Sequence, residues 1–185
     1  MGARSYAWQR ADAGVGHSFA RVAAESGGGW RFDGTEILVA RGRPMRASFS
    51  VTLDAAWRTR AVEVEVLTRR HVTLRLDADD GHRWRMNGRR AARLEGCIDV
   101  DIAATPLTNT FPIRRYADLA VGSSRTSPVA WVEVPSLRVV RVDQTYRRLG
   151  RDEWEYSDPR HGAYRLKVDP DGIVLDYEGF ATRVR

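Results

Sequence analysis

Hydrophobic and polar residues alternate along much of the chain with a period of two residues, not the 3.6 of a helix. Since neighbouring side chains of a strand point to opposite faces, each alternating segment has one apolar and one polar side. The clearest examples are residues 48–53, 62–66, 72–77, 98–102 and 164–168. Short helical turns are expected only near residues 54–57 and 89–94. The pattern therefore predicts an all-β protein with an antiparallel sheet that is solvated on one face.

Glycine-containing pairs punctuate these segments and supply the positive φ angles of hairpin turns. They are Gly27-Gly28-Gly29, Asp33-Gly34, Asp80-Gly81, Asn87-Gly88 and Asp171-Gly172. No linker rich in proline and serine divides the chain. Many short strands joined by regular turns predict a barrel, sandwich or roll, and we expect a single domain over residues 1–185.

A weak internal echo relates residues 74–79 to residues 166–171. Each segment leads to a glycine, and a second glycine follows seven residues later. The echo would suit two related halves, at about residues 1–93 and 94–185. The alternative is that strand–turn–strand hairpins resemble one another without common origin, and the sequence leaves both interpretations open.

The composition is that of an ordinary soluble globular protein, with 43% hydrophobic and 29% charged residues in a chain of 185. Cys97 is the only cysteine, which excludes an intrachain disulfide, a CxxC zinc site and an iron–sulfur cluster. The four histidines lack metal-ligand spacing. The N-terminal residues show no apolar segment of signal-peptide length. We therefore expect a cytoplasmic protein without metal or cofactor and without a membrane span.

The charge balance is basic, with a formal net charge of +6, and 29 of the 30 cationic residues are arginine. Residues 1–93 hold 17 cations and 10 anions, an asymmetry that would suit a nucleic-acid backbone. The arginines are nevertheless scattered over alternating strands, and no nucleic-acid motif accompanies them. Because lysine is almost absent, the arginine excess indicates a compositional preference of the genome. We expect no nucleic-acid partner.

Asp99 and Asp101 stand two residues apart on a predicted strand, hence on one face and about 7 Å apart. That spacing would suit the two carboxylates of an inverting glycosidase. The simpler interpretation is that they form the polar side of an alternating strand or pair with arginines. No GxSxG, Walker A or GxGxxG motif is present.

The most distinctive segment is residues 105–115, TPLTNTFPIRR. Pro112 biases the preceding Phe111 towards an extended conformation. If the following residues are extended too, Arg114 and Arg115 face opposite sides, and one of them enters the interior. A buried arginine needs a partner, and Asp99 or Asp101 could supply it. The segment is then either a crossover braced by an ion pair or a ligand contact.

Aromatic residues are abundant, with six tryptophans and six tyrosines. Most are expected to fill the core. Trp131 differs because it shares a strand face with Val129 and Glu133, which suits a mixed polar and apolar pocket.

Several motifs together resemble the bacterial putative glycolipid-binding family. They are residues 96–101 (GCIDVD), 105–115, 129–137 (VAWVEVPSL), 144–146 (QTY), 171–177 (DGIVLDY) and 56–64 (AWRTRAVEV). Phe111 departs mildly from the leucine expected at its position. The resemblance covers nearly the whole chain. It implies an antiparallel sheet curled into a spiral roll or half-barrel, and noncatalytic binding of a glycolipid or similar amphiphile.

The resulting hypothesis is a binding protein whose curved sheet encloses an elongated apolar cavity with a polar mouth. The candidate ligand contacts are Trp84, Asn109, Arg114, Arg115, Trp131 and Tyr146. Asp99 and Asp101 are candidates for structural pairing, and no catalytic or metal-binding residue is assigned. The alternative is a small-substrate, hydrolase-like enzyme that uses Asp99, Asp101 and a pocket arginine; nucleic-acid binding ranks third. The oligomeric state is left open.

Overall fold

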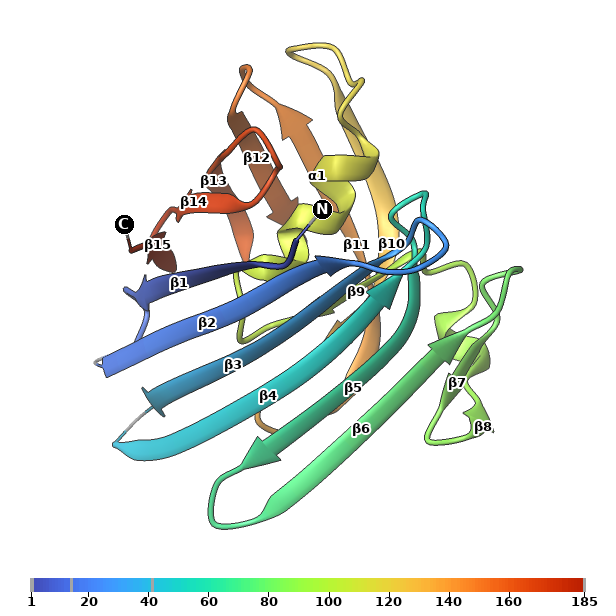
Figure 1. Ribbon diagram of the computed structural model, residues 1–185, viewed down its shortest axis with the longest axis vertical. Helices are drawn as coiled ribbons and strands as arrows, with labels where there is room; N and C mark the ends of the chain where they lie inside the picture. The colour runs from blue at the N-terminus through green and yellow to red at the C-terminus, as the bar shows by residue number, and fades with distance from the viewer. Residues whose placement is uncertain (1, 14, 41, 185) are drawn as a thin grey trace.

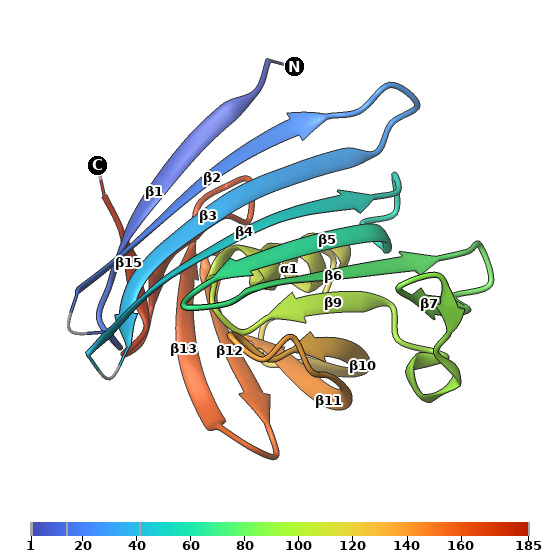
Figure 2. The same ribbon diagram turned by 90° about the horizontal axis from the view of Figure 1, so that it is seen from below.

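The computed structural model describes residues 2–13, 15–40 and 42–184. In this part of the chain fifteen strands form one sheet (Figures 1 and 2). The strands of the first half are β1 (Arg4–Arg10), β2 (Val15–Ala24), β3 (Trp30–Ala40), β4 (Arg43–Leu53), β5 (Thr59–Leu67), β6 (His71–Ala78), β7 (Trp84–Met86) and β8 (Arg89–Arg90). The others are β9 (Asp99–Ile102), β10 (Ser124–Val132), β11 (Val139–Arg148), β12 (Glu153–Asp158), β13 (Gly162–Val168), β14 (Val174–Tyr177) and β15 (Ala181–Arg183).

The strand order is β8-β7-β6-β5-β4-β3-β2-β1-β15-β14-β13-β12-β11-β10-β9. Neighbouring strands in the described chain are antiparallel, except that β9 runs parallel to β10. The sheet curls until its edge strand β9 approaches β5, where the amide of Thr59 donates to the carbonyl of Ile98 at 3.1 Å. The hydroxyl of Thr59 accepts from the amide of Val100 at 3.1 Å. The sheet stays open between β8 and β9, which confirms the predicted all-β half-barrel.

The period of two predicts the strands well. In β5, for example, Val62, Val64 and Val66 are buried and Glu63 is exposed. The predicted turn at Asp33-Gly34 is wrong, because both residues lie inside β3. Gly34 faces Phe49 of β4, whose ring occupies the space that a side chain would need.

Helical elements are short: η1 (Ala92–Leu94), η2 (Leu107–Asn109) and α1 (Thr110–Arg115). The extended conformation predicted for Phe111 is therefore wrong, and the condition that residues 113–115 are extended does not hold. Pro112 lies in the first turn of α1, where a missing N–H costs no hydrogen bond. None of the helices in the described residues is long and apolar enough to cross a membrane.

Helix α1 lies on the concave side of the sheet (Figures 1 and 2). Its first four residues, Thr110 to Ile113, are buried. Phe111 packs edge-on against Phe32 of β3, with ring centroids 4.9 Å apart. Ile113 joins a second cluster with Tyr146 and aliphatic and aromatic residues of β12–β14. The curved sheet is thus filled where α1 lies.

Both echoing segments contain the same kind of turn, although it begins at the last residue of 74–79 and at the fourth residue of 166–171. The carboxylates of Asp79 and Asp169 each accept the backbone N–H groups of the second and fourth following residues, at 2.9–3.0 Å. Asp54 makes the same two contacts in the β4–β5 turn. Because this turn recurs outside the echo, it does not discriminate between a duplication and a local motif, and the duplication stays a prediction.

Candidate functional site

A pocket of about 210 Å³ lies at the end of the sheet where β9 and β10 terminate and the β1–β2, β12–β13 and β14–β15 connections meet. We call it the aromatic pocket. Its aromatic lining consists of Trp131, Tyr156, Tyr164, Tyr177 and Phe180. Its polar lining includes Asp12, Asp101, Asn109, His161 and Glu178. Aromatic faces beside a few polar groups are typical of sites that fix the orientation of a small ligand.

Trp131 and Asp101 are neighbours because β9 and β10 run in parallel register at this point. The indole of Trp131 is half-buried. The ring of His161 packs against it at 5.3 Å between centroids, and the guanidinium of Arg160 lies 5.5 Å from its ring. A cation at that distance from an indole contributes modestly to holding the ring in place.

Asp101 is held by two neutral donors. The hydroxyl of Thr108 donates to Oδ1 at 2.7 Å, and the side-chain amide of Gln144 donates to Oδ2 at 2.6 Å. Burial raises the pKa of Asp101, and these two hydrogen bonds partly offset that effect. Its carboxylate therefore meets the pocket without a cationic partner bound to it.

The network continues from Gln144 to the hairpin between β12 and β13. The Gln144 amide also lies 3.0 Å from the hydroxyl of Tyr156, which in turn donates to Asp158. Asp158 also lies 2.9 Å from Nδ1 of His161. Against the desolvation caused by burial, hydrogen bonds from Tyr156, His161 and two backbone amides lower the pKa of Asp158. The carboxylate thus orients the imidazole, whose other nitrogen is not used in this contact.

Asn109 connects the pocket to the core. Its side-chain amide donates to the carbonyl of Pro106 at 3.1 Å, and its Oδ1 accepts from the hydroxyl of Tyr146 at 2.8 Å. Tyr146 is fully buried behind Asn109, and burial raises its pKa. Tyr146 therefore positions Asn109.

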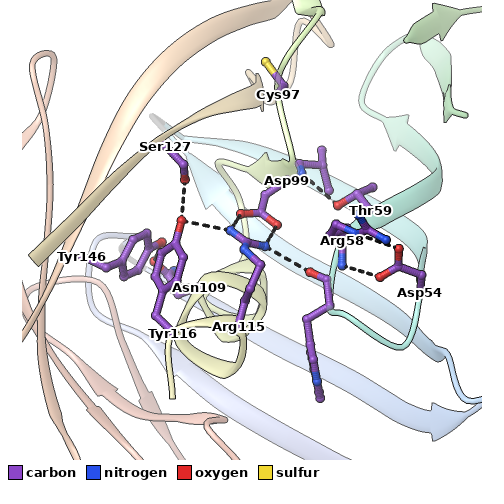
Figure 3. Close-up of polar contacts among 12 residues, drawn as sticks. Asp54, Arg58, Thr59, Cys97, Asp99, Asn109, Arg115, Tyr116, Ser127 and Tyr146 are labelled. Atoms are coloured by element: carbon purple, nitrogen blue, oxygen red, sulfur yellow. Dashed lines mark hydrogen bonds and ion pairs between the residues drawn. The ribbon is translucent and has the colours of Figure 1, made fainter. Parts of the chain in front are cut away.

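Asp99, two residues before Asp101, has a different environment (Figure 3). It is buried, and both of its oxygens accept hydrogen bonds from the guanidinium of Arg115. Arg115 also donates to the carbonyl of Trp57 at 3.1 Å and to the hydroxyl of Tyr116 at 3.2 Å. Burial raises the pKa of Asp99, while Arg115 draws it back towards the ionised form. The pair links the end of α1 to β9 and to the β4–β5 turn.

Comparison with known protein families gives a match over almost the whole chain. Residues 5–183 match the family described as "Putative glycolipid-binding". The chain belongs to this family. No curated protein matches the chain.

Two solved structures resemble this member of the glycolipid-binding family. One is a DUF1089 family protein from Pseudomonas aeruginosa, 28% identical with a TM-score of 0.81, in which the match covers 90% of this chain and 92% of that one. The other is a β-barrel-like protein with a DUF1849 domain from Brucella abortus, 11% identical with a TM-score of 0.53, covering 99% and 95%. The second likeness concerns the fold alone.

The structure does not bring the six candidate ligand contacts together. Asn109 and Trp131 line the aromatic pocket, and Tyr146 lies directly behind it. Arg115 is bound to Asp99, and the guanidinium of Arg114 lies 5.0 Å from the ring of Trp57, outside the pocket lining. Trp84 is also outside it: the side chain is buried and donates to the carbonyl of Cys97 at 2.9 Å.

Sequence reasoning missed several lining residues, among them Asp12, His161, Tyr164, Tyr177 and Phe180. Four of these five lie in or beside hairpin connections that meet only in the folded chain. For His161 the sequence does hold a signal, namely an aspartate, Asp158, three residues earlier in the same turn. This spacing lets a carboxylate orient an imidazole, and it differs from the spacing of metal ligands.

Proposed function

We propose that the aromatic pocket binds the sugar headgroup of a glycolipid or a similar amphiphile, without chemical turnover. The observation that carries this proposal is the combination of aromatic side chains with the carboxylate of Asp101 and the amide of Asn109. A sugar ring offers apolar C–H faces that pack on aromatic rings and hydroxyls that donate to carboxylate and amide oxygens. Membership of the glycolipid-binding family supports the same ligand class.

The size of the pocket limits what enters it. Its volume of about 210 Å³ is below the roughly 300–1,000 Å³ of sites that enclose drug-sized ligands. The headgroup, as one sugar ring, is therefore the part that we place in this pocket. The acyl chain would extend from it.

The charges of the pocket restrict the headgroup further. Asp101 and Glu178 line it, and the carboxylate of Asp12 is held by Arg10 at 2.8 Å. Among the described lining residues, His161 is the basic one. Since like charges repel strongly in a partly desolvated site, an uncharged or amine-bearing sugar fits better than a phosphorylated or acidic one.

Calorimetric titration with soluble alkyl glycosides tests the proposal. A short-chain alkyl glucoside should bind saturably, and an alkyl phosphate of the same chain length should bind much more weakly. Trp131→Ala should weaken glucoside binding by about threefold to tenfold. Phe19→Ala, which removes an exposed aromatic ring from the outer face of β2, is the matched control and should leave binding unchanged. Equal binding of both amphiphiles, or equal effects of both variants, would overturn the proposal.

The Asp158–His161 pair favours a second candidate function, that of a small-substrate hydrolase. An imidazole held at Nδ1 by a carboxylate can act as a general base through its other nitrogen. Asp99 contributes nothing to such chemistry, because Arg115 occupies both of its oxygens. Hydrolysis of a nitrophenyl glycoside or ester that is lost in His161→Gln would establish turnover. Activity no higher than buffer background in the wild-type protein would exclude it for those substrates.

A further inference from the structure

Two adjacent hairpin ends carry an excess of positive charge. Residues 39–46 and 66–73, at the β3–β4 and β5–β6 connections, together contain five arginines and no acidic residue. Of these arginines, Arg43, Arg69 and Arg70 form no ion pair with any residue that the structure describes. Arg46 is paired with Glu65.

About half of the arginines elsewhere in the described chain are matched by carboxylates. Arg31 pairs with Asp33 at 3.0 Å, and Arg75 pairs with Glu63 at 2.6 Å. Arg83, Arg90 and Arg138 have acidic partners as well. Others, such as Arg85 and Arg89, form no ion pair with the described residues, so unmatched charge alone does not set the two hairpin ends apart. What distinguishes them is the exposed aliphatic side chains beside their arginines.

Exposed apolar side chains lie beside these arginines. Val15, Ile37, Val39 and Leu67 are 62%, 60%, 37% and 43% exposed. Val15 is the cross-strand partner of Val39, and Arg46 is the partner of both Ile37 and Leu67. The register thus places them in adjoining rows across β2–β5. We call this surface, together with Arg43, Arg69 and Arg70, the basic rim.

Large exposed aliphatic side chains that lie next to one another are uncommon on a monomer and mark interaction sites. Unmatched arginines beside them suit a partner that offers phosphate groups over an apolar layer. An anionic bilayer has that composition, because its phosphates attract arginine and its acyl boundary accepts aliphatic side chains. A nucleic acid offers the phosphates but would leave the aliphatic side chains exposed.

The position of the basic rim relates it to the aromatic pocket. In an antiparallel sheet the odd-to-even connections of successive hairpins lie at one end. The ends of β1, β3 and β5 follow one another along one side of the sheet in Figure 1. Since β15 pairs antiparallel with β1, the β14–β15 connection of the pocket belongs to that end too.

We propose that the basic rim docks on an anionic lipid surface. Docking would bring the end of the sheet that carries the pocket to the membrane, where an amphiphile could be taken up. The inference goes beyond headgroup binding and does not require it. Each can fail while the other holds.

Vesicle sedimentation tests the proposal. The full chain should sediment with vesicles of phosphatidylcholine and phosphatidylglycerol, and much less with phosphatidylcholine alone. The double variant Arg69→Glu/Arg70→Glu should weaken binding to the anionic vesicles by at least about tenfold. Leu67→Ser should weaken vesicle binding less. Its effect should be seen in the binding that remains at high salt, where the attraction between arginine and phosphate is screened. The matched control is Arg85→Glu/Arg89→Glu, which makes the same charge change on the exposed residues of β7 and β8 and should have little effect.

Three results would overturn the proposal. One is equal binding to both kinds of vesicle, and another is an equal loss in the two double variants. The third is that duplex DNA, or a second copy of the chain seen by sedimentation velocity, occupies the rim more tightly than vesicles do. Titration with the soluble alkyl glucoside distinguishes failure of membrane docking from failure of the proposed function. Arg69→Glu/Arg70→Glu should leave headgroup binding unchanged. Circular dichroism melting curves confirm that each variant is folded.

Discussion

Strand β9 carries two aspartates, Asp99 and Asp101, in contrasting surroundings although one residue separates them. Asp99 is buried and meets the guanidinium of Arg115 with both oxygens. Asp101 is half-buried at the aromatic pocket and accepts from a hydroxyl and an amide, which are both neutral. A carboxylate matched by a cation is a fixed structural link. A carboxylate held by neutral donors has no cation of the protein bound to it and stays available to a ligand.

The difference arises from what packs against β9. The C-terminal end of α1 places Arg115 on Asp99, whereas η2 and β11 place Thr108 and Gln144 on Asp101. The same strand therefore provides a brace at one point and a site at the next. Substitutions at the two points should therefore differ in their effects on stability and on binding.

Asp99→Ala should cost about 3–5 kcal/mol of unfolding free energy, because it leaves the charge of Arg115 buried without its partner. Urea denaturation followed by tryptophan fluorescence measures this change. Asp118→Ala is the control, since Asp118 is exposed and forms no ion pair with the described residues. A loss of about 1 kcal/mol or less in Asp99→Ala would contradict the brace.

Glu36 of β3 is a buried carboxylate that is less well matched than Asp99. Ser18 donates to one of its oxygens and Arg10 lies 3.3 Å from the same atom, while Oε1 has no partner among the described residues. Burial raises the pKa of Glu36 to about 7 from an ordinary 4.5. The folded state therefore binds a proton on Glu36 more tightly than the unfolded state does. The stability that results is fully present below pH 4.5 and is lost as the pH rises through 7.

As the pH rises from 4.5 to 7, the titration of Glu36 should therefore lower the unfolding free energy by up to about 3 kcal/mol. Glu36→Gln should flatten this part of the profile, because an amide does not titrate. Unfolding free energies of both proteins measured at intervals over that pH range test the prediction. Parallel profiles for the two proteins would show that Glu36 is ionised in the folded state throughout.

Asp101→Asn should weaken binding of an alkyl glucoside by about 1.5–3 kcal/mol, the value of a hydrogen bond to a charged group. Its effect on unfolding free energy should be smaller than that of Asp99→Ala, because no buried cation loses its partner. Calorimetric titration and urea denaturation of the same preparation give both quantities. The comparison fails if the variant is destabilised as much as Asp99→Ala but binds the glucoside normally.

The sheet could be predicted from the sequence because strand formation follows a local pattern. Val62, Val64 and Val66 show by their spacing alone that they face the core. Helix α1 could not, because the local preference of Phe111 before Pro112 is for extended backbone. Burial of Phe111 against Phe32 outweighs that preference, and this contact joins residues far apart in the chain.

The candidate site was predictable to a smaller extent. The neighbours of Trp131 on its strand face predict a mixed polar and apolar pocket, and Asn109 is a polar residue of the distinctive segment 105–115; both line the aromatic pocket. Asp12, His161 and Phe180 were not predicted, since periodicity shows which residues face inwards but not which hairpins meet. Arg115 was considered for both a brace and a ligand contact, and only its position against Asp99 distinguishes them.

Two buried tyrosines, one at the pocket and one at the Asp99 brace, give the smallest expected effects and the most selective test of the two roles. Tyr146 donates to Asn109 at the pocket, and Tyr116 donates to Ser127 at 2.9 Å beside the Asp99 brace. Replacing either by phenylalanine removes one hydroxyl and should cost about 1 kcal/mol of unfolding free energy. Tyr146→Phe should also weaken glucoside binding, because the amide of Asn109 loses the contact that orients it. Tyr116→Phe should leave binding unchanged, and equal binding losses in the two variants would show that the brace and the pocket act as one unit.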